Sequence, residues 1–440
     1  MNSFWAEYAW LPNGLQAAVS FEVADGCFAH VQVGAEPRSD QHVLSGVTLP
    51  GLANGHSHAF HRALRGRTHA AGGSFWTWRQ QMYALAARLD PDSYFALARA
   101  VFAEMAQAGY TVVGEFHYLH HDHRGRRYAD PNAMGRALLQ AATEAGVRLT
   151  LLDTCYLAGG LTATGHLPLD AIQRRFSDGD VDRWQARLSE LTEADRTRIG
   201  AAVHSVRAVP AEALSKIGEA AGERPLHVHL SEQPAENAVT QAWYGRTPTE
   251  LLDDHGLLGR RTTVVHATHL TDADIKTLGG TQTSACICPT TERDLADGIG
   301  PAQRLASAGS PLTLGSDQQA VIDPFEEMRG LELHERLASG ERGRFRPAEL
   351  IMIASEAGYR SLGWRGGGRI ANGALADFVV IRSDTVRTTG ARPDQIAYAA
   401  TAADVDLVVV AGQVVVRDGY HQLGSPARLL LVALDDLGEA

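Results

Sequence analysis

Short apolar segments alternate with longer amphipathic ones through most of this chain, and this alternation limits the possible folds more than any other feature. Eight strand-like runs can be counted, and most intervals between them carry helical periodicity, for example 92–108 and 210–221. This order is typical of parallel strands joined by crossover helices, and eight repeats indicate a closed barrel. The runs are 47–50, 110–117, 149–153, 199–204, 226–230, 262–266, 281–288 and 312–317.

The two chain ends carry strand patterns of a different kind. Residues 1–49 consist of short alternating pieces between glycine and proline turns, which are typical of a small sheet. After the glycines at 366–368, strand character returns at 376–381 and 407–416. We therefore predict an α/β fold with two domains: a (β/α)8 TIM-like barrel from residues 50–364, and a small discontinuous β-sandwich domain from residues 1–49 and 365–440.

The composition is that of an ordinary globular protein, with 45% hydrophobic and 21% charged residues. We find no N-terminal secretion signal and no uninterrupted apolar run of ~18 residues, so we expect a cytoplasmic protein without membrane contact. The net charge of −11 opposes binding to nucleic acid, which is itself polyanionic. The four cysteines follow no zinc-finger or disulfide pattern and are expected to be reduced. The expected partners are a small-molecule substrate and a second copy of the chain in a homodimer.

Two histidines follow the first apolar run, at the point where a buried strand is about to end. In an extended chain His56 and His58 point the same way, about 6.5–7 Å apart along the strand, which suits two imidazoles that bind one metal ion. A catalytic metal site needs about three protein ligands and a position left open for water. Two histidines alone do not make such a site, so further ligands are expected downstream.

The carboxyl ends of other strands supply these candidates, because function in an eight-fold barrel gathers there. The fifth run ends with His229, and Glu232 lies just beyond it, where it could reach a substrate atom beside the metal. The sixth run ends with His266 and the eighth with Asp317. An aspartate at the end of an apolar strand is costly to bury unless a metal or hydrogen bonds compensate it. Asp317 is therefore the expected final ligand.

These parts predict a hydrolytic reaction. A divalent metal lowers the pKa of bound water from 15.7 toward ~7, which makes hydroxide available at neutral pH. Asp317 and His266 can take the proton of the water, and Glu232 can pass a proton to a leaving nitrogen. The only lysines, Lys216 and Lys276, lie in helix-like segments and offer no bridge between two metals, so one ion is the simpler interpretation. Zinc is expected, and Fe²⁺ is the alternative.

The same residues resemble the amidohydrolase superfamily over nearly the whole sequence. The resemblance rests on Gly55–His58, His229–Glu232, His266, Gly315–Asp317 and the closing segment from Gly373. Within the superfamily the chain looks most like the formimidoylglutamate deiminases of histidine degradation, on the motifs that begin at His58, Phe75, Gly114, His204 and Cys288. This resemblance implies a zinc-dependent conversion of N-formimino-L-glutamate to N-formyl-L-glutamate and ammonia, in which hydroxide attacks the formimino carbon. It implies zinc ligands at His56, His58, His229 and Asp317, and proton transfer by Glu232, His266 and Asp317.

The implied substrate carries two carboxylates, and arginine forks suit such groups. Arg207 ends the fourth run and Arg79 follows an aromatic pair, so both are candidates, with Tyr118 and His204 as hydrogen-bond partners. Position 61 is histidine where the family pattern usually has glutamine, and we place His61 on the substrate side. Asp294 replaces an expected asparagine, and an extra anion near a dianion is unfavourable. Either this side chain faces away from the substrate or the substrate differs.

Two other functions fit parts of the pattern. One is a zinc deaminase of a cyclic amidine, such as a purine or a pterin, which would need an apolar stacking pocket and have little need for two arginines. The other is a non-catalytic zinc-binding barrel. The presence of Glu232 and His266 argues against the non-catalytic barrel, because a purely structural zinc site is closed and needs no acid/base pair.

Overall fold

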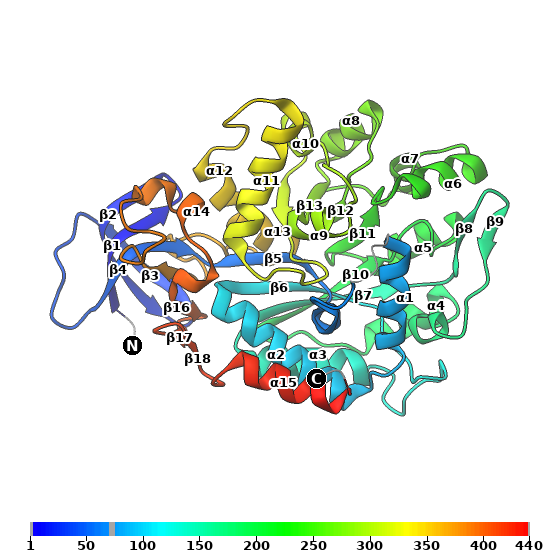
Figure 1. Ribbon diagram of the computed structural model, residues 1–440, viewed down its shortest axis with the longest axis horizontal. Coiled ribbons are helices and arrows are strands. Elements are labelled where there is room, and N and C mark those ends of the chain that lie inside the picture. The colour runs from blue at the N-terminus through cyan, green and yellow to red at the C-terminus, as the bar shows by residue number, and fades with distance from the viewer. Residues whose placement is uncertain (1–2, 70–74, 439–440) are drawn as a thin grey trace.

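The computed structural model describes residues 3–69 and 75–438, and its largest feature is a barrel of eight parallel strands surrounded by helices (Figure 1). The strands follow the order β14-β13-β12-β11-β10-β7-β6-β5, as expected for successive crossover units. The predicted fold class is confirmed. The strands are β5 (Leu52–Ser57), β6 (Tyr110–His117), β7 (Arg148–Cys155), β10 (Thr197–Val203), β11 (Leu226–Leu230), β12 (Thr262–His266), β13 (Ser284–Ile287) and β14 (Leu312–Leu314).

The barrel closes where its first strand meets the chain just beyond its last strand. Ser57 forms an isolated parallel bridge with Asp317. The approach is so close that only glycine fits on either side: a Cβ added to Gly315 would lie 2.8 Å from the His56 carbonyl oxygen, and one added to Gly55 would lie 2.9 Å from Thr313 Oγ1. These two glycines therefore permit the closure that brings residues near 56 and 317 together.

Helices on the outside cover the barrel, and the two predicted as examples end within one residue of the observed bounds. Helix α2 (Pro91–Ala108) begins with a capping box between Asp90 and Ser93, and it ends at Gly109 in the left-handed conformation (φ 108°). The other helices are α1 (Phe75–Ala86), α3 (Ala133–Ala145), α4 (Val181–Ser189), α5 (Ala211–Ala221), α6 (Pro234–Tyr244), α7 (Pro248–Asp254), α8 (Asp272–Thr281), α9 (Pro289–Asp294), α10 (Ala302–Ala308), α11 (Pro324–Ser339), α12 (Pro347–Met352), α13 (Gly358–Ser361), α14 (Ile396–Ala399) and α15 (Pro426–Asp436).

Several shorter elements join the helices. A π-helical turn, η3 (Ile353–Ala357), links α12 to α13, and a two-stranded hairpin formed by β8 (Gly160–Thr162) and β9 (Gly165–Leu167) stands outside the barrel. No helix in the described part of the chain combines the length and the apolarity that crossing a bilayer requires. The 3-10 helices are η1 (Ala59–Leu64), η2 (Gln173–Phe176), η4 (Pro393–Gln395) and η5 (Ala402–Asp404).

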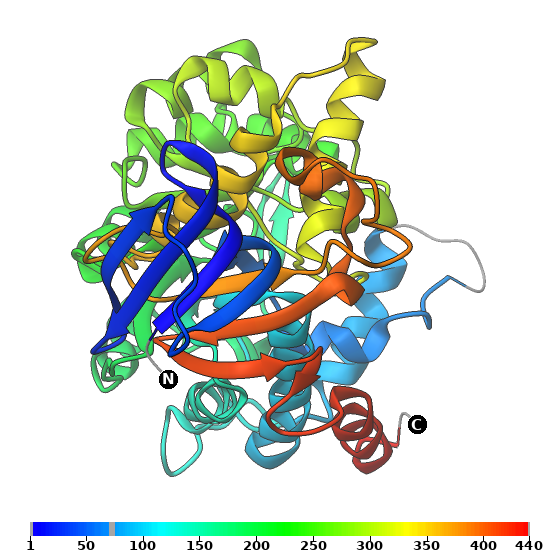
Figure 2. The ribbon, with the colours of Figure 1, turned by 90° about the vertical axis from the view of Figure 1, so that its left-hand side faces the viewer.

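A second eight-stranded sheet comes from both chain ends, as predicted for the small β domain, and it lies at the end of the barrel opposite to α1 and η1 (Figures 1 and 2). Along β15, Phe378 and Val380 face a separate aromatic core, whereas Val379 and Ile381 join the main core. In the order β18-β17-β16-β15-β4-β1-β2-β3, the strands are β1 (Ser3–Leu11), β2 (Gly14–Ala24), β3 (Cys27–Val33), β4 (His42–Pro50), β15 (Phe378–Ile381), β16 (Val405–Val410), β17 (Gln413–Arg417) and β18 (Tyr420–His421).

Two of the eight predicted runs need correction. The run 47–50 is not a barrel strand, because it forms the end of β4 and pairs antiparallel with β15. It is buried on both faces between the two cores, so its apolar pattern is the same as that of a barrel strand, and the first barrel strand begins only after Gly51. The run 281–288 starts too early, since Thr281 ends α8 and Gln282 turns the chain in the left-handed conformation.

Candidate active site

One cavity of about 350 Å³ opens at the carboxyl ends of the barrel strands. All of the predicted catalytic, metal-binding and substrate-binding residues line it except His56, which is fully buried directly behind His58. The hairpin β8–β9 and helices α1 and α6 contribute the outer wall. The structure thus brings together residues that the sequence places on six different strand ends and one helix.

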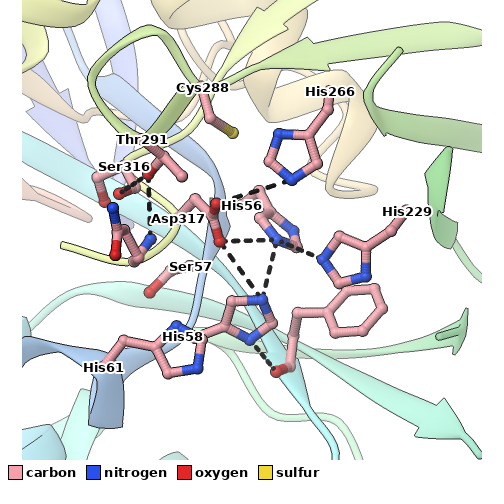
Figure 3. Close-up of polar contacts among 12 residues, drawn as sticks. His56, Ser57, His58, His61, His229, His266, Cys288, Thr291, Ser316 and Asp317 are labelled. Atoms are coloured by element: carbon pink, nitrogen blue, oxygen red, sulfur yellow. Dashed lines mark hydrogen bonds and ion pairs between the residues drawn. The ribbon is translucent and has the colours of Figure 1, made fainter. Parts of the chain in front are cut away.

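Three imidazole rings converge at the bottom of this cavity (Figure 3). The Nε2 atom of His56 lies 3.2 Å from Nε2 of His58 and 3.1 Å from Nε2 of His229. Asp317 Oδ1 lies 3.5 Å from both His56 Nε2 and His58 Nε2. Four ligands arranged tetrahedrally at zinc–nitrogen distances of 2.0–2.1 Å would be about 3.3 Å from one another. The observed separations fit such an arrangement.

In two of these rings, a hydrogen bond from Nδ1 fixes the orientation of the ring and leaves the lone pair of Nε2 pointing toward the common centre. His58 Nδ1 donates to the backbone oxygen of Phe116 at 3.0 Å, and His229 Nδ1 donates to that of His204 at 2.9 Å. Each ring then presents an unprotonated Nε2 to the common centre, as is usual for histidines that bind metals. The donor set of three imidazole nitrogens and one carboxylate oxygen fits a divalent ion such as zinc or iron.

Asp317 follows the last strand at a positive φ of 42°, a conformation that is uncommon for residues other than glycine. This backbone turns the carboxylate toward the histidines, with Oδ2 at 3.7 Å from His266 Nε2. Burial raises the pKa of Asp317, but the hydrogen bond to His56 and the charge of His266 outweigh it and hold the pKa well below its usual range. Asp317 is therefore a carboxylate at neutral pH.

His266 ends β12 and is held between acidic groups. Its Nδ1 lies 3.4 Å from Glu292 Oε1, which also accepts a hydrogen bond from the backbone N–H of Cys288 at 2.8 Å. Burial lowers the pKa of His266, but the contact with Glu292 and the charges of Glu232 and Asp317 raise it to about 10. Glu292 was not among the predicted site residues, although it stands four residues after the seventh apolar run.

Glu232 lies just beyond β11 and faces both the histidines and an arginine. Its Oε1 is 3.9 Å from His266 Nε2, and its Oε2 accepts a hydrogen bond from Arg207 Nη2 at 3.0 Å. The Nε of Arg207 lies 3.3 Å from Oε2 of Glu236, in the first turn of α6. Glu236 was not predicted, and because Glu232 precedes α6, the spacing of the two glutamates does not by itself place them side by side.

A second polar group of the cavity surrounds Arg79 on α1. The Nε of Arg79 donates to the hydroxyl of Tyr83 at 3.0 Å, and the guanidinium lies 5.0 Å from the centre of that ring. Gln173 Nε2 donates to the hydroxyls of Tyr83 and Tyr156, at 3.1 Å in both cases. Tyr156 directly follows β7 and Gln173 begins the short helix η2, and neither was predicted as a site residue. Arg79 thus lines the cavity within a network of hydroxyl groups.

The remaining predicted substrate residues lie beside the histidine cluster. His61 Nε2 is 3.0 Å from the hydroxyl of Tyr118, and burial lowers the pKa of His61 to about 3, so the ring is neutral at physiological pH. His204 meets the ring of Tyr156 edge-on, and burial together with the charge of Arg207 lowers its pKa well below 6.5. Asp294 contacts His69 and Gln318 rather than the cavity lining, so this substitution adds no carboxylate to the described cavity wall.

The chain is similar to known proteins over most of its length. A family model described as "Amidohydrolase family" matches residues 47–415. The chain is 37% identical to the formimidoylglutamate deiminase of Pseudomonas aeruginosa over 96% of both proteins. It is 30% identical to the 8-oxoguanine deaminase of the same organism, over 92% of this chain and 91% of that protein. A crystal structure of an amidohydrolase from Brucella melitensis superimposes with a TM-score of 0.92 at 33% identity, covering 99% of this chain and all of that one.

Proposed function

Because the chain belongs to the amidohydrolase family and is a hydrolase acting on carbon–nitrogen bonds, we propose that it deiminates N-formimino-L-glutamate to N-formyl-L-glutamate and ammonia. This reaction belongs to histidine degradation. One observation carries the choice of substrate: two arginines, Arg207 and Arg79, line the same cavity as the cluster of histidines and Asp317. A dianionic substrate with an amidine at one end calls for that combination of charges.

The proposed cofactor is one zinc ion, held by His56, His58, His229 and Asp317. The support is the convergence of two further Nε2 atoms, of His58 and His229, and one carboxylate oxygen within 3.5 Å of His56 Nε2. When bound, such an ion acts as a Lewis acid and makes water nucleophilic near neutral pH. The protein groups around it then have to move protons and hold the substrate.

The proton transfers fall to His266 and to the two carboxylates that lie within 4 Å of its Nε2 atom, Asp317 and Glu232. Water adds its oxygen to the formimino carbon, and Asp317 accepts the proton that the water loses at Oδ2. His266 keeps a proton on Nε2, 3.7 Å from that oxygen, and donates toward the developing negative charge. Glu232 Oε1 takes the second water proton from the hydroxyl of the adduct and passes it to the terminal nitrogen, which starts as the protonated amidinium, while Asp317 later returns its proton to solvent. The carbon–nitrogen bond then breaks, ammonia leaves, and the remaining oxygen becomes the formyl carbonyl.

The substrate carboxylates are proposed to bind Arg207 and Arg79, which approach the cavity from different elements. Tyr118 and His204 line the cavity beside His58 and His229, respectively, where they can donate or accept hydrogen bonds. His61 supports the Tyr118 hydroxyl through its Nε2 atom. Aromatic rings on the remaining wall exclude water from the reacting carbon.

The test of this proposal is ammonia release by the purified zinc-loaded protein supplied with N-formimino-L-glutamate. Glu232→Gln should lower kcat by about 10²–10⁴-fold, the usual contribution of a general acid/base, while the bound zinc is retained. Loss of the metal in that variant would make Glu232 a ligand and contradict the role given to it. No ammonia from this substrate would refute the proposed activity.

A second candidate is deamination of a cyclic amidine. The aromatic lining of the cavity favours it, because planar heterocycles stack on such rings. The lining includes Trp78, Tyr83, Tyr118, Tyr156 and Phe176. A parallel assay with guanine, adenosine and formimino-aspartate separates the two candidates. Faster turnover of a purine than of the linear dianion would favour this second activity.

A further inference from the structure

Arg207 is held between two carboxylates, and one of them is the proposed proton carrier. Its Nη2 donates to Glu232 Oε2 at 3.0 Å, and its Nε lies 3.3 Å from Glu236 Oε2. The side chains of Arg207 and Glu232 are 13% and 7% exposed, and that of Glu236 is fully buried. Charge-assisted hydrogen bonds of this kind are strong away from bulk water. In this state Glu232 is therefore restrained by an arginine.

The proposed reaction needs both partners of this pair for something else. Glu232 has to reach the terminal nitrogen of the substrate, and Arg207 has to meet a substrate carboxylate. A carboxylate of the substrate offers the same two oxygens to the guanidinium as Glu232 does. The arriving substrate and the resident glutamate are thus chemically equivalent partners for the same edge of Arg207.

We propose that a substrate carboxylate replaces Glu232 on Arg207, so that binding of the carboxylate releases Glu232 for proton transfer. This inference rests on the proposed function and adds a control of the same site: an amidine without a carboxylate leaves Glu232 restrained and is turned over slowly. Recognition of the distant end of the substrate is then coupled to the chemistry at the formimino carbon.

Glu236 makes such an exchange possible. It lies against Nε of Arg207, whereas Glu232 accepts from Nη2, so Glu236 can hold the guanidinium while the partner on Nη2 changes. Among the described residues, both oxygens of Glu236 lack a hydrogen bond of good geometry. Its buried charge is therefore balanced mainly by Arg207, which ties the two side chains together. We assign Glu236 as a positioning residue for Arg207.

The decisive experiment compares two substrates in zinc-loaded wild-type protein and in Arg207→Met. One substrate is N-formimino-L-glutamate and the other is N-propylformamidine, which has the amidine but no carboxylate. Arg207→Met should lower kcat/KM for N-formimino-L-glutamate by about 10²-fold. It should raise kcat/KM for the amidine by about tenfold, because it removes one charge-assisted hydrogen bond that restrains Glu232. An unchanged or lower rate with the amidine would overturn the proposal.

A matched control comes from the other arginine of the cavity. Arg79→Met should also lower kcat/KM for the dianion but should not raise the rate with the amidine, because Arg79 donates to Tyr83. An equal rise with the amidine in Arg79→Met would show a general effect of charge and would contradict the specific pair. Arg207→Met/Glu236→Gln removes one cation with one anion, and it replaces the single variant if that variant folds poorly.

A crystal structure of the zinc-loaded wild-type protein with glutarate gives a readout without turnover. A glutarate carboxylate should lie on Nη2 of Arg207, with Glu232 moved out of hydrogen-bond distance and Glu236 still at Nε. Glutarate bound in the cavity with Glu232 still on Arg207 would refute the exchange. If the wild-type protein releases no ammonia from N-formimino-L-glutamate, the proposed function fails, while the amidine assay and this structure still test the restraint on Glu232.

Discussion

Gly315→Ala tests how strongly the metal-ligand cluster depends on barrel closure. A Cβ at this position would lie 2.8 Å from the carbonyl oxygen of His56 and 2.9 Å from its Cβ and its N, whereas ordinary contacts begin at 3.4 Å. The backbone of Gly315 is outside the left-handed region, so the effect of the methyl group is steric. The strand that carries His56 would have to retreat by about 0.5 Å, and overpacking of this kind costs about 1–3 kcal/mol.

The same shift moves a proposed ligand, and metal sites tolerate only about 0.2 Å in their distances. We therefore expect Gly315→Ala to bind zinc about 10–100-fold more weakly, as when the support of a ligand is lost. Zinc affinity is measured by chelator competition, and stability by urea unfolding of the metal-free protein. Gly280→Ala is the control, because a Cβ in that helix meets nothing within 4 Å and should leave zinc affinity unchanged. Wild-type zinc affinity in Gly315→Ala would refute the reasoning.

Three further changes probe other parts of the molecule. Glu292→Gln should lower the pKa of His266, because it removes the carboxylate that stabilises the protonated ring. The change is measured as a shift of one limb of the pH profile of kcat/KM, and an unchanged profile would contradict the contact between His266 and Glu292. Arg187→Met should cost about 3–5 kcal/mol in urea unfolding, because this arginine bridges two buried aspartates; a loss under 1 kcal/mol would contradict the pairing. Burial lowers the pKa of His227 to about 3 in the folded protein. As the pH falls below 6.5, this histidine takes up a proton in the unfolded chain but not in the folded one, so the folded state loses stability. His227→Gln should remove up to about 2 kcal/mol of that loss between pH 7 and 5, and an equal loss in both proteins would count against it.

The sequence contained enough information for the barrel and for its catalytic end. His229, His266 and Asp317 each stand at the end of an apolar run, and parallel strands of a closed barrel must bring such ends together. Short apolar runs do not reveal what covers them, however. Residues 47–50 look like a barrel strand because they are buried on both faces, although the second face packs against the aromatic core of the terminal sheet.

The site residues that the sequence did not indicate share a physical cause. Glu236 lies on helix α6 and Gln173 on the short 3-10 helix η2, where no strand periodicity fixes the direction of a side chain. A glutamate on an amphipathic helix is normally solvated, and only the fold shows that Glu236 is turned inward against Arg207. The partners of a residue in such elements depend on how loops pack over the barrel, and spacing along the chain does not encode this.

The bridge between Ser57 and Asp317 sets the order of events when the protein is made. The cluster at the bottom of the cavity takes residues from the first and the last barrel strands, so most of its contacts have a high sequence separation. A ribosome has to finish the whole barrel before the final carboxylate can join the three imidazoles. With the proposed ligand set, metal uptake would be a late step of biogenesis, and a nascent chain that stops before Asp317 lacks the carboxylate of that set.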